Sequence, residues 1–329
     1  MTDAPRPQGA FSLAGGWCWF DRVAVLERGQ PARLIAAADV PGETLARLTA
    51  PRAMIAGLTL DVPRLMGILN VTPDSFSDGG RFFDPAAAVA QARALAAGGA
   101  DILDIGGEST RPGAPEVPLA EEIARTAPVI AALRAGGLTA PISIDTRKAP
   151  VAEAALAAGA QMVNDVAAFS FDPAMAALVA ARGVPVCLMH AQGRPATMQA
   201  APHYDDVLLD VYDYLAARLA VTEAAGICKS RIVLDPGLGF GKTLAHNVAL
   251  LQGMALFHAL GCPILLGASR KRFIGTLGQA DAPQDRVAGS VAVALAGVAQ
   301  GVQLLRVHDI SETRQAVAVW RAVTIRGKT

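Results

Sequence analysis

The sequence predicts an α/β fold, a single (β/α)8 TIM barrel that follows an N-terminal extension, and three observations support this prediction. From Leu65 onward, short apolar runs alternate with Ala- and Leu-rich helical stretches, at roughly 33 residues per unit, the size of a barrel repeat. The apolar runs lack a polar face, as strands of a helix-covered parallel sheet do. The chain is 52% hydrophobic and 18% charged, which suits one large core. A doubly wound open sheet is the competing architecture, but eight similar units ending near residue 325 favour the closed barrel.

Eight strands are expected, each bounded by polar or glycine residues. They are Leu65–Leu69, Asp101–Ile105, Pro141–Ile144, Gln161–Val163, Pro185–Met189, Arg231–Leu234, Pro263–Gly267 and Val302–Val307. The helices after them are expected to begin near Pro85, Leu119, Ala149, Pro173, Asp205, Leu244, Gln284 and Ser311. Two of these starts, Pro85 and Pro173, follow an aspartate, a good helix cap before a proline at the first helical position.

Residues 1–60 differ from the rest of the chain and form the predicted N-terminal extension, with the barrel domain in residues 61–329. Trp17–Glu27 and Pro31–Ala38 have the composition of two short strands around the turn at Arg28–Gln30, a short β-hairpin. Prolines and a glycine at 41, 42 and 51 interrupt the pattern after it. The sequence assigns no function to this extension.

Composition excludes several classes of partner. Basic and acidic residues number 29 each, so no basic face favours a nucleic acid. The longest apolar runs stop near nine residues, and a membrane-spanning helix needs about twenty. The N-terminus lacks the basic region of a signal peptide. Four cysteines are scattered without a C-x-x-C pair, which is typical of a reducing compartment, so a cytoplasmic location is expected.

A polar residue stands at the carboxyl end of every expected strand, where barrels carry out their chemistry. These positions are Asn70, Asp104, Asp145, Asn164 with Asp165, His190, Asp235, Ser269 to Lys271, and Arg306 with His308. A single aspartate after a strand is most often a helix cap, but eight polar strand ends on one rim indicate a site. By contrast, His203, His246 and His258 lie at a helix start or on helices and are interpreted as surface residues.

The strand-end residues divide into two groups by chemistry. Asp145, Asn164 and Asp235 can accept hydrogen bonds from a flat heterocycle that carries amino and ring N–H groups. Arg111, Arg306, His308 and Asn70 suit an anion, because arginine binds phosphate in a bidentate manner and an amide oxygen can bind a hard metal ion. We therefore expect a heterocycle pocket beside a phosphate clamp.

Three loops border this expected site. Two of them, at 70–80 and 106–113, are rich in Gly, Ser and Pro, and a lid role is one interpretation of each. The third, Asp235–Thr243, carries glycines that match neither a P-loop nor a dinucleotide fingerprint. These glycines are expected to shape a loop that holds Phe240 over the site.

Two long segments make the chain resemble the dihydropteroate synthase family: Met66–Gly80, which reads MGILNVTPDSFSDGG, and Asp104–Gly113, which reads DIGGESTRPG. Six shorter matches follow in order, at Ile144–Thr146, Val163–Asp165, Leu188–His190, Asp235–Lys242, Ser269–Lys271 and Arg306–His308. The resemblance implies a TIM barrel that joins 6-hydroxymethyl-7,8-dihydropterin diphosphate to 4-aminobenzoate in folate synthesis and releases diphosphate. It also implies a homodimer.

The resemblance also implies roles for single residues. The pterin would be bound by Asp145, Asn164, Asp235 and Lys271. The diphosphate would be held by Asn70, Arg111, Arg306 and His308, with Asn70 touching Mg²⁺. The aminobenzoate would be bordered by Ser109, Thr110, Pro112, Phe240 and Ser269, and the reacting CH₂ would lie near Asp78. The residues implied to act in catalysis are Asp78, Thr110, Arg111, Lys271, Arg306 and His308. One departure is Ala191 after His190, a small residue expected to loosen packing around the pterin.

Two other functions remain as alternatives. A pterin-binding domain that passes a methyl group to a corrinoid partner would need no diphosphate clamp, so Arg111, Arg306 and His308 argue against it. A non-catalytic pterin-binding relative, with the extension as an interaction module, is the other.

Overall fold

The computed structural model describes residues 7–72, 84–109, 114, 116–193 and 197–324. Eight parallel strands form the central sheet, in the order β10-β9-β8-β7-β6-β5-β12-β11. The strands are β5 (Arg64–Asn70), β6 (Ile102–Gly106), β7 (Ile142–Asp145), β8 (Met162–Asp165), β9 (Val186–Met189), β10 (Ile232–Asp235), β11 (Leu265–Leu266) and β12 (Leu304–Val307). A parallel bridge between Leu234 and Ile264 joins the two ends of the sheet, so the predicted TIM barrel is confirmed.

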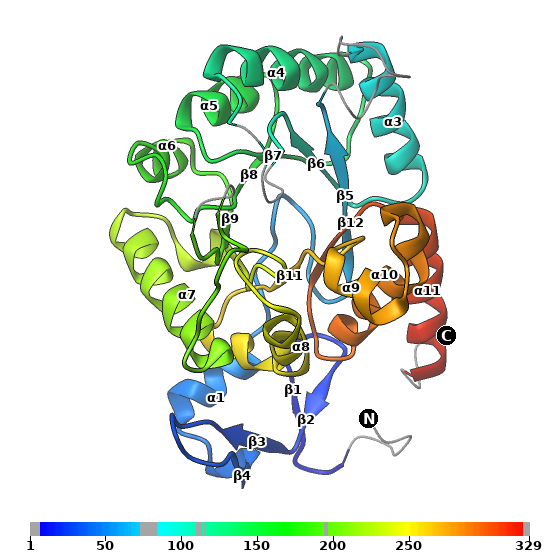
Figure 1. Cartoon of the computed structure of the whole chain (residues 1–329). Coiled ribbons are helices and arrows are strands. Elements are labelled where there is room, and N and C mark those ends of the chain that lie inside the picture. Colours follow the sequence, from blue (N-terminus) through cyan, green and yellow to red (C-terminus); the bar gives the residue numbers. More distant parts are fainter. Residues whose placement is uncertain (1–6, 73–83, 110–113, 115, 194–196, 325–329) are drawn as a thin grey trace.

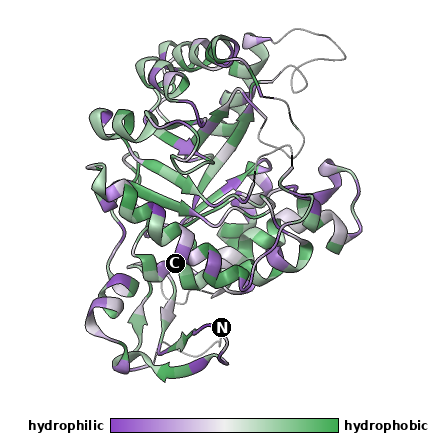
Figure 2. Cartoon of the chain, turned by 60° about the vertical axis from the view of Figure 1, so that its left-hand side comes forward, coloured by the Kyte–Doolittle hydropathy of each residue, from purple (hydrophilic) through white to green (hydrophobic). Residues whose placement is uncertain are grey.

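Helices surround the barrel, as Figure 1 shows. They are α3 (Pro85–Ala97), α4 (Leu119–Ala135), α5 (Ala149–Ala157), α6 (Met175–Arg182), α7 (Val207–Ala224), α8 (Leu244–Gln252), α9 (Arg272–Gly278), α10 (Val287–Val298) and α11 (Ile310–Thr324). Short 3-10 helices are η2 (Lys229–Arg231), η3 (Met254–Leu260) and η4 (Pro283–Arg286). The strand residues are almost all buried, whereas the helices mix hydrophobic and hydrophilic residues (Figure 2), as expected when helices cover a parallel sheet.

Two helix starts show how well capping was predicted. The side chain of Asp84 accepts a hydrogen bond from Ala86 N at 2.8 Å, and α3 begins at the proline between them, as predicted. Asp172 instead accepts from Ala174 N and from Ala149 N at the start of α5, and α6 begins two residues later than expected. The same carboxylate therefore serves two helix starts.

Two helices were not predicted. Between β11 and β12 the helix expected near Gln284 is present as η4 and α10, but the short α9 that precedes them was not predicted. In the extension, α1 (Gly42–Thr49) occupies the stretch where Pro41 and Pro51 were taken to break the pattern. Pro41 in fact stands at the N-cap, a position where proline leaves the helical hydrogen bonds intact.

The predicted hairpin in the extension is present. β3 (Arg22–Val25) pairs with β4 (Arg33–Ala36) in antiparallel register, and a second pair joins β1 (Phe11–Ser12) to β2 (Trp19–Phe20). A 3-10 helix, η1 (Ala37–Asp39), follows β4. Figure 1 shows this group beside one end of the barrel. The expected strand at 17–27 is thus divided between the two pairs.

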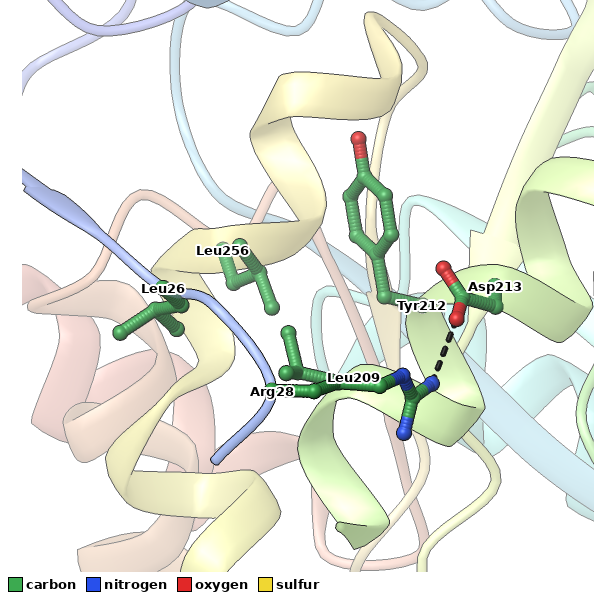
Figure 3. Close-up of a pocket in the computed structure, with 6 residues that line it drawn as sticks. All are labelled: Leu26, Arg28, Leu209, Tyr212, Asp213 and Leu256. Atoms are coloured by element: carbon green, nitrogen blue, oxygen red, sulfur yellow. Dashed lines mark hydrogen bonds and ion pairs between the residues drawn. The ribbon is translucent and has the colours of Figure 1, made fainter. Parts of the chain in front are cut away.

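Several contacts among the described residues tie the extension to the barrel. Trp17 Nε1 donates to Val298 O at 2.8 Å, and Arg52 Nη2 donates to His258 O at 3.1 Å. Arg28 pairs with Asp210 and Asp213 of α7. Figure 3 shows the pair with Asp213 at a cavity whose lining residues are Leu26, Arg28, Leu209, Tyr212, Asp213 and Leu256. The prediction that His258 lies on the surface was wrong, because its ring is fully buried in η3 and its Nε2 lies 2.9 Å from Gln300 O.

The end of the extension completes the base of the barrel. Ile55 and Leu60 are buried at 0% and 3% exposure in a cluster with Met66, Ile102, Met162, Cys187, Val233, Leu265 and Leu304 from seven barrel strands. A bridge between Ile55 and Leu58 folds this segment into a tight hairpin. Residues 55–60 therefore fill the inside of the barrel at one end, opposite the strand ends that carry the site.

Candidate active site

Three polar strand residues meet around one guanidinium at the carboxyl ends of the strands. Arg306 of β12 donates from Nε to Asp104 Oδ2 of β6 and from Nη2 to Asp145 Oδ2 of β7, each at 2.6 Å. Asn164 of β8 donates from Nδ2 to the same Asp104 oxygen at 3.0 Å. All but Arg306 are buried, and the arginine side chain is 20% exposed. The structure thus brings Arg306 together with Asp145 and Asn164, which the sequence assigned to the pterin.

Two oxygens of this cluster have no partner in the part of the chain that the structure describes. They are Asp104 Oδ1 and Asp145 Oδ1, both buried. Burial raises the pKa of Asp145 to about 7, although the neighbouring Arg306 opposes the rise. A buried acceptor without a donor costs about 1–3 kcal/mol, so N–H groups of a ligand that meet these oxygens are favoured.

The loop after β10 brings a second carboxylate and a lysine to the site. Asp235 accepts from Gly237 N at 2.7 Å through Oδ1. Lys271 Nζ donates to the carbonyl of Leu238 and lies 4.4 Å from the centre of the Phe240 ring. Burial lowers the pKa of Lys271 to about 8, against the favourable charge of Asp235. The expectation that this glycine-rich loop holds Phe240 at the strand ends agrees with these contacts.

Ser269 and His308 form a pair on neighbouring strand ends. Ser269 Oγ accepts from His308 N at 3.2 Å and lies 3.0 Å from His308 Nδ1. Between Ser269 and Lys271, Arg270 adopts a φ of +58°, a conformation rare for a residue with a side chain. Its guanidinium pairs with Asp309, and its backbone N donates to Ser290. The turn therefore points Ser269 toward His308 and Lys271 toward Asp235.

A second buried ionic cluster shapes the loop after β6. Lys148 Nζ donates to Glu108 at 2.5 Å and to Glu122 at 2.8 Å, and Arg147 also donates to Glu108 at 2.8 Å. Thr146 donates to Glu122 at 2.7 Å. Glu108 thus fixes the loop directly before the partly exposed Ser109.

Asn70, the last residue of β5, is the predicted ligand of Mg²⁺, and its side chain is half-buried. The described residues hold no group of three or more His, Cys, Asp or Glu side chains arranged for a metal ion. An amide oxygen is a hard ligand, but it supplies one position of an octahedral set. The chain fits Mg²⁺ where phosphate and water oxygens provide the remaining ligands.

Some predicted residues fall outside the described part of the chain. These are Asp78, Thr110, Arg111 and Pro112. Their assigned roles stay predictions.

Three residues for which no ligand-binding role was predicted belong to the site or its surroundings. Asp104 was predicted only as one of the polar strand ends, and it accepts hydrogen bonds from Arg306 and Asn164. Lys242 and His190 form a buried pair at 2.8 Å beneath the glycine-rich loop. The signal for Lys242 was its place at the end of the segment Asp235–Lys242, but a lysine after glycines is normally assumed to be solvated.

The fold and the site define a class of protein: a (β/α)8 barrel with a cluster of buried polar and charged side chains at the carboxyl ends of its strands, where barrel enzymes carry their active sites. The pterin binding enzyme family model matches residues 66–308, and the chain belongs to that family.

Its relatives include dihydropteroate synthases. That of Neisseria meningitidis serogroup B is 51% identical over 272 residues, which cover 81% of this chain and 94% of that protein. The solved structure of the Xanthomonas albilineans enzyme with 4-aminobenzoic acid has a TM-score of 0.78 and 52% identity, and covers 84% of this chain and 98% of its own. The same enzyme in complex with 7,8-dihydropteroate has a TM-score of 0.75 and 50% identity, with coverage of 83% and 98%. The resemblance found in the sequence is confirmed.

Proposed function

We propose that this protein condenses 6-hydroxymethyl-7,8-dihydropterin diphosphate with 4-aminobenzoate to give 7,8-dihydropteroate and diphosphate, the activity of a dihydropteroate synthase. The family membership and the names of its relatives support this transferase activity. The observation that carries the proposal in the structure is the pair of unpartnered carboxylate oxygens, Asp104 Oδ1 and Asp145 Oδ1, around Arg306.

The pterin ring is the ligand that suits this cluster. Its 2-amino group and ring N–H groups are donors, and Asp145, Asp235 and the Asn164 carbonyl are acceptors on strands at the rim. Lys271 supplies a point charge for the ring carbonyl, and Arg306 neutralises the two carboxylates that it bridges. A site with matched acceptors rejects analogues that lack the donors, because its own oxygens would stay unpaired.

The diphosphate group requires cationic and polar residues beside the pterin. The residues assigned to it are His308, Asn70 and Arg111. Arg306 pairs with the two carboxylates through Nε and Nη2, so its Nη1 takes no part in these ion pairs. Mg²⁺ held by Asn70 and by diphosphate oxygens would neutralise part of the negative charge on the leaving diphosphate. The chain's own contribution is to hold the diphosphate so that its departure is in line with the incoming amine.

The reaction needs help mainly in bond breaking. The arylamine is neutral at pH 7, so its lone pair is available without a base. The C–O bond of the CH₂ group breaks, diphosphate leaves with the electron pair, the amine nitrogen forms the new C–N bond, and the nitrogen then loses a proton. Charge develops on both fragments, so preorganised groups of opposite sign supply the stabilisation. Arg306 and His308 act toward diphosphate, and Asp78 toward the cationic carbon.

The decisive experiment measures diphosphate release from the dihydropterin diphosphate with Mg²⁺, with and without 4-aminobenzoate. Release coupled to formation of dihydropteroate is the expected result. Pterin binding without release would contradict the proposal and favour a methyl-transfer domain or a non-catalytic pterin-binding protein.

Two further properties belong to the same proposal. We infer a homodimer from the family resemblance; sedimentation at micromolar concentration tests it. We also infer a cytoplasmic location, which is supported by the four free cysteines at 18, 187, 228 and 262. In the described residues, no helix is long and apolar enough to cross a membrane.

A further inference from the structure

Lys242 is a buried lysine that the mechanism above does not use. It ends the loop after β10 and is only 3% exposed. Its Nζ lies 2.8 Å from His190 Nδ1, 2.8 Å from Gly237 O and 3.1 Å from Phe240 O. An ammonium group has three donors, and these three acceptors satisfy all of them.

The contact determines the state of His190. Burial lowers the pKa of Lys242 well below its ordinary value, although the charge of Asp235 opposes the shift. While the amine stays protonated it can only donate, so Nδ1 of His190 is then the acceptor and the ring proton lies on Nε2. The ring is buried in edge contact with Tyr214, with centroids 4.8 Å apart and planes at 83°. Burial, together with the charge of Lys242, lowers the pKa of His190 to about 3. His190 is therefore a neutral imidazole that serves as an anchor point.

The loop lies directly on the backbone that follows β9. Gly237, Gly239 and Gly241 all have positive φ, at +68°, +81° and +62°. A Cβ atom at Gly237 would lie 1.8 Å from His190 O, and one at Gly241 would lie 2.4 Å from Gln192 O. This close approach requires glycine, and glycine adds conformational freedom that something else must restrict.

Lys242 binds two carbonyls of this loop, and other backbone groups of the same loop contact the site residues Lys271 and Asp235. The carbonyls of Gly237 and Phe240 face Lys242, whereas the intervening carbonyl of Leu238 accepts from Lys271. Gly237 N donates to Asp235. The two lysines thus bind three carbonyls of one loop, and Gln199 donates to the fourth, that of Gly239.

We propose that Lys242, through His190, is a positioning residue for the pterin pocket: it fixes the loop so that Asp235, Phe240 and Lys271 keep the arrangement that binds the ring. The inference rests on the proposed function for the identity of the ligand. Lys242 touches no reacting atom, so its loss acts on binding more than on the chemical step.

The first test replaces the ammonium with a chain of similar length, in Lys242→Met. The pterin Kd by calorimetry is expected to rise at least about tenfold, because the loop loses a buried hydrogen bond from the lysine side chain. The KM for 4-aminobenzoate should rise as well, since Phe240 borders its pocket, while kcat changes less than about threefold. The control is Lys229→Met, which replaces a lysine of η2 and should change neither the pterin Kd nor the KM for 4-aminobenzoate. A pterin Kd within about twofold of the parent value would overturn the proposal.

Two substitutions of the partner separate the contact from general packing. His190→Asn keeps an acceptor near the position of Nδ1 and should retain most of the pterin affinity, whereas His190→Leu should match Lys242→Met. In the double variant, adding His190→Leu to Lys242→Met should raise the pterin Kd by less than a further factor of about two, because both substitutions remove the same hydrogen bond. Full additivity would show that Lys242 acts independently of His190 and would overturn the pairing.

A third measurement needs no ligand and tests the contact itself. The chain has five histidines, so ¹⁵N spectra can be assigned by single substitution. His190 is expected to be the Nε2–H tautomer and not to titrate between about pH 5 and pH 8. A proton on Nδ1, or titration in that range, would overturn the proposal. If the parent protein makes no dihydropteroate but Lys242→Met still weakens pterin binding, the proposed function fails while this inference stands.

Discussion

Arg306 is the residue that joins the two buried carboxylates of the site. It is the cation between Asp104 and Asp145, and the sequence placed it in the diphosphate clamp. The identity of the site residues followed from their places at strand ends, but their pairing did not. Nothing in the one-dimensional pattern tells which of eight strand-end side chains will bond to which, because pairing depends on side-chain length and on the tilt of strands around the barrel.

Arg306→Ala should lower kcat/KM by about 10² to 10³, because it removes a preorganised cation and leaves two buried carboxylates unpaired. Steady-state formation of dihydropteroate measures the change. Arg182→Ala, which removes an exposed pair with Glu153, is the control and should have no effect. A loss smaller than about threefold would remove Arg306 from its assigned role.

The affinity for pterin should depend on pH through Asp145. Burial raises the pKa of this carboxyl to about 7, so the free protein carries it mostly protonated in mild acid. The pterin N–H groups need the ionised acceptor, and affinity should therefore rise about tenfold per pH unit between pH 5.5 and 7 and then level off. Calorimetry in matched buffers checks the profile. Asp145→Asn should bind weakly and without this slope; a flat profile in the parent protein would contradict the assignment.

Lys271→Arg should weaken pterin binding although it keeps the charge. The ammonium is a compact donor that reaches Leu238 O above the Phe240 ring, and a planar guanidinium does not fit the same place. We expect the pterin Kd to rise about tenfold, a loss of about 1.4 kcal/mol. Arg272→Lys, one residue further along the chain at the start of α9, is the control. Unchanged affinity in Lys271→Arg would refute the role of the point charge.

Among the secondary-structure elements, the strands and long helices of the barrel could be predicted from apolar runs and helix caps, whereas two short helices could not. All eight strands and most helix starts follow from apolar runs and from aspartates such as Asp84. α9 has seven residues and α1 eight, too short for a periodic pattern to be distinguished from a loop. These helices are stabilised by packing that is visible only in three dimensions.

The N-cap of α7 offers a direct test at this scale. Asp206 accepts from Leu208 N at 3.0 Å and from Leu209 N at 3.1 Å. Asp206→Ala should lower the free energy of unfolding by about 1 kcal/mol in urea titrations, because two terminal N–H groups lose their acceptor. Its neighbour Asp205, with a side chain 92% exposed, is the matched control. Equal effects of the two alanines would show that the cap contributes nothing.

At the scale of the molecule, the extension is part of the barrel's stability. Trp17 donates to the last residue of α10, and its ring packs against the core. Trp17→Ala should lower the free energy of unfolding by about 2 kcal/mol, a reduced value for a half-buried aromatic residue, and leave kcat/KM within about twofold. Denaturation and rate measurements check both. Leu34→Ala, at 66% exposure, is the control. A large loss of activity with intact stability would instead assign the extension a catalytic role.

The ion pair between Asp104 and Arg306 joins residues 202 positions apart in the sequence. Its two strands flank β5, so the pair forms only when the final strand docks beside the first. During synthesis, β5 to β10 emerge long before Arg306, and until then Asp104 and Asp145 lack their counter-charge. Docking of β12 beside β5 therefore completes the pocket and pairs the last strand with the first in a single event. A pterin ligand that contacts these same strands would bind the closed barrel and not its open intermediates, and would therefore stabilise the closed barrel.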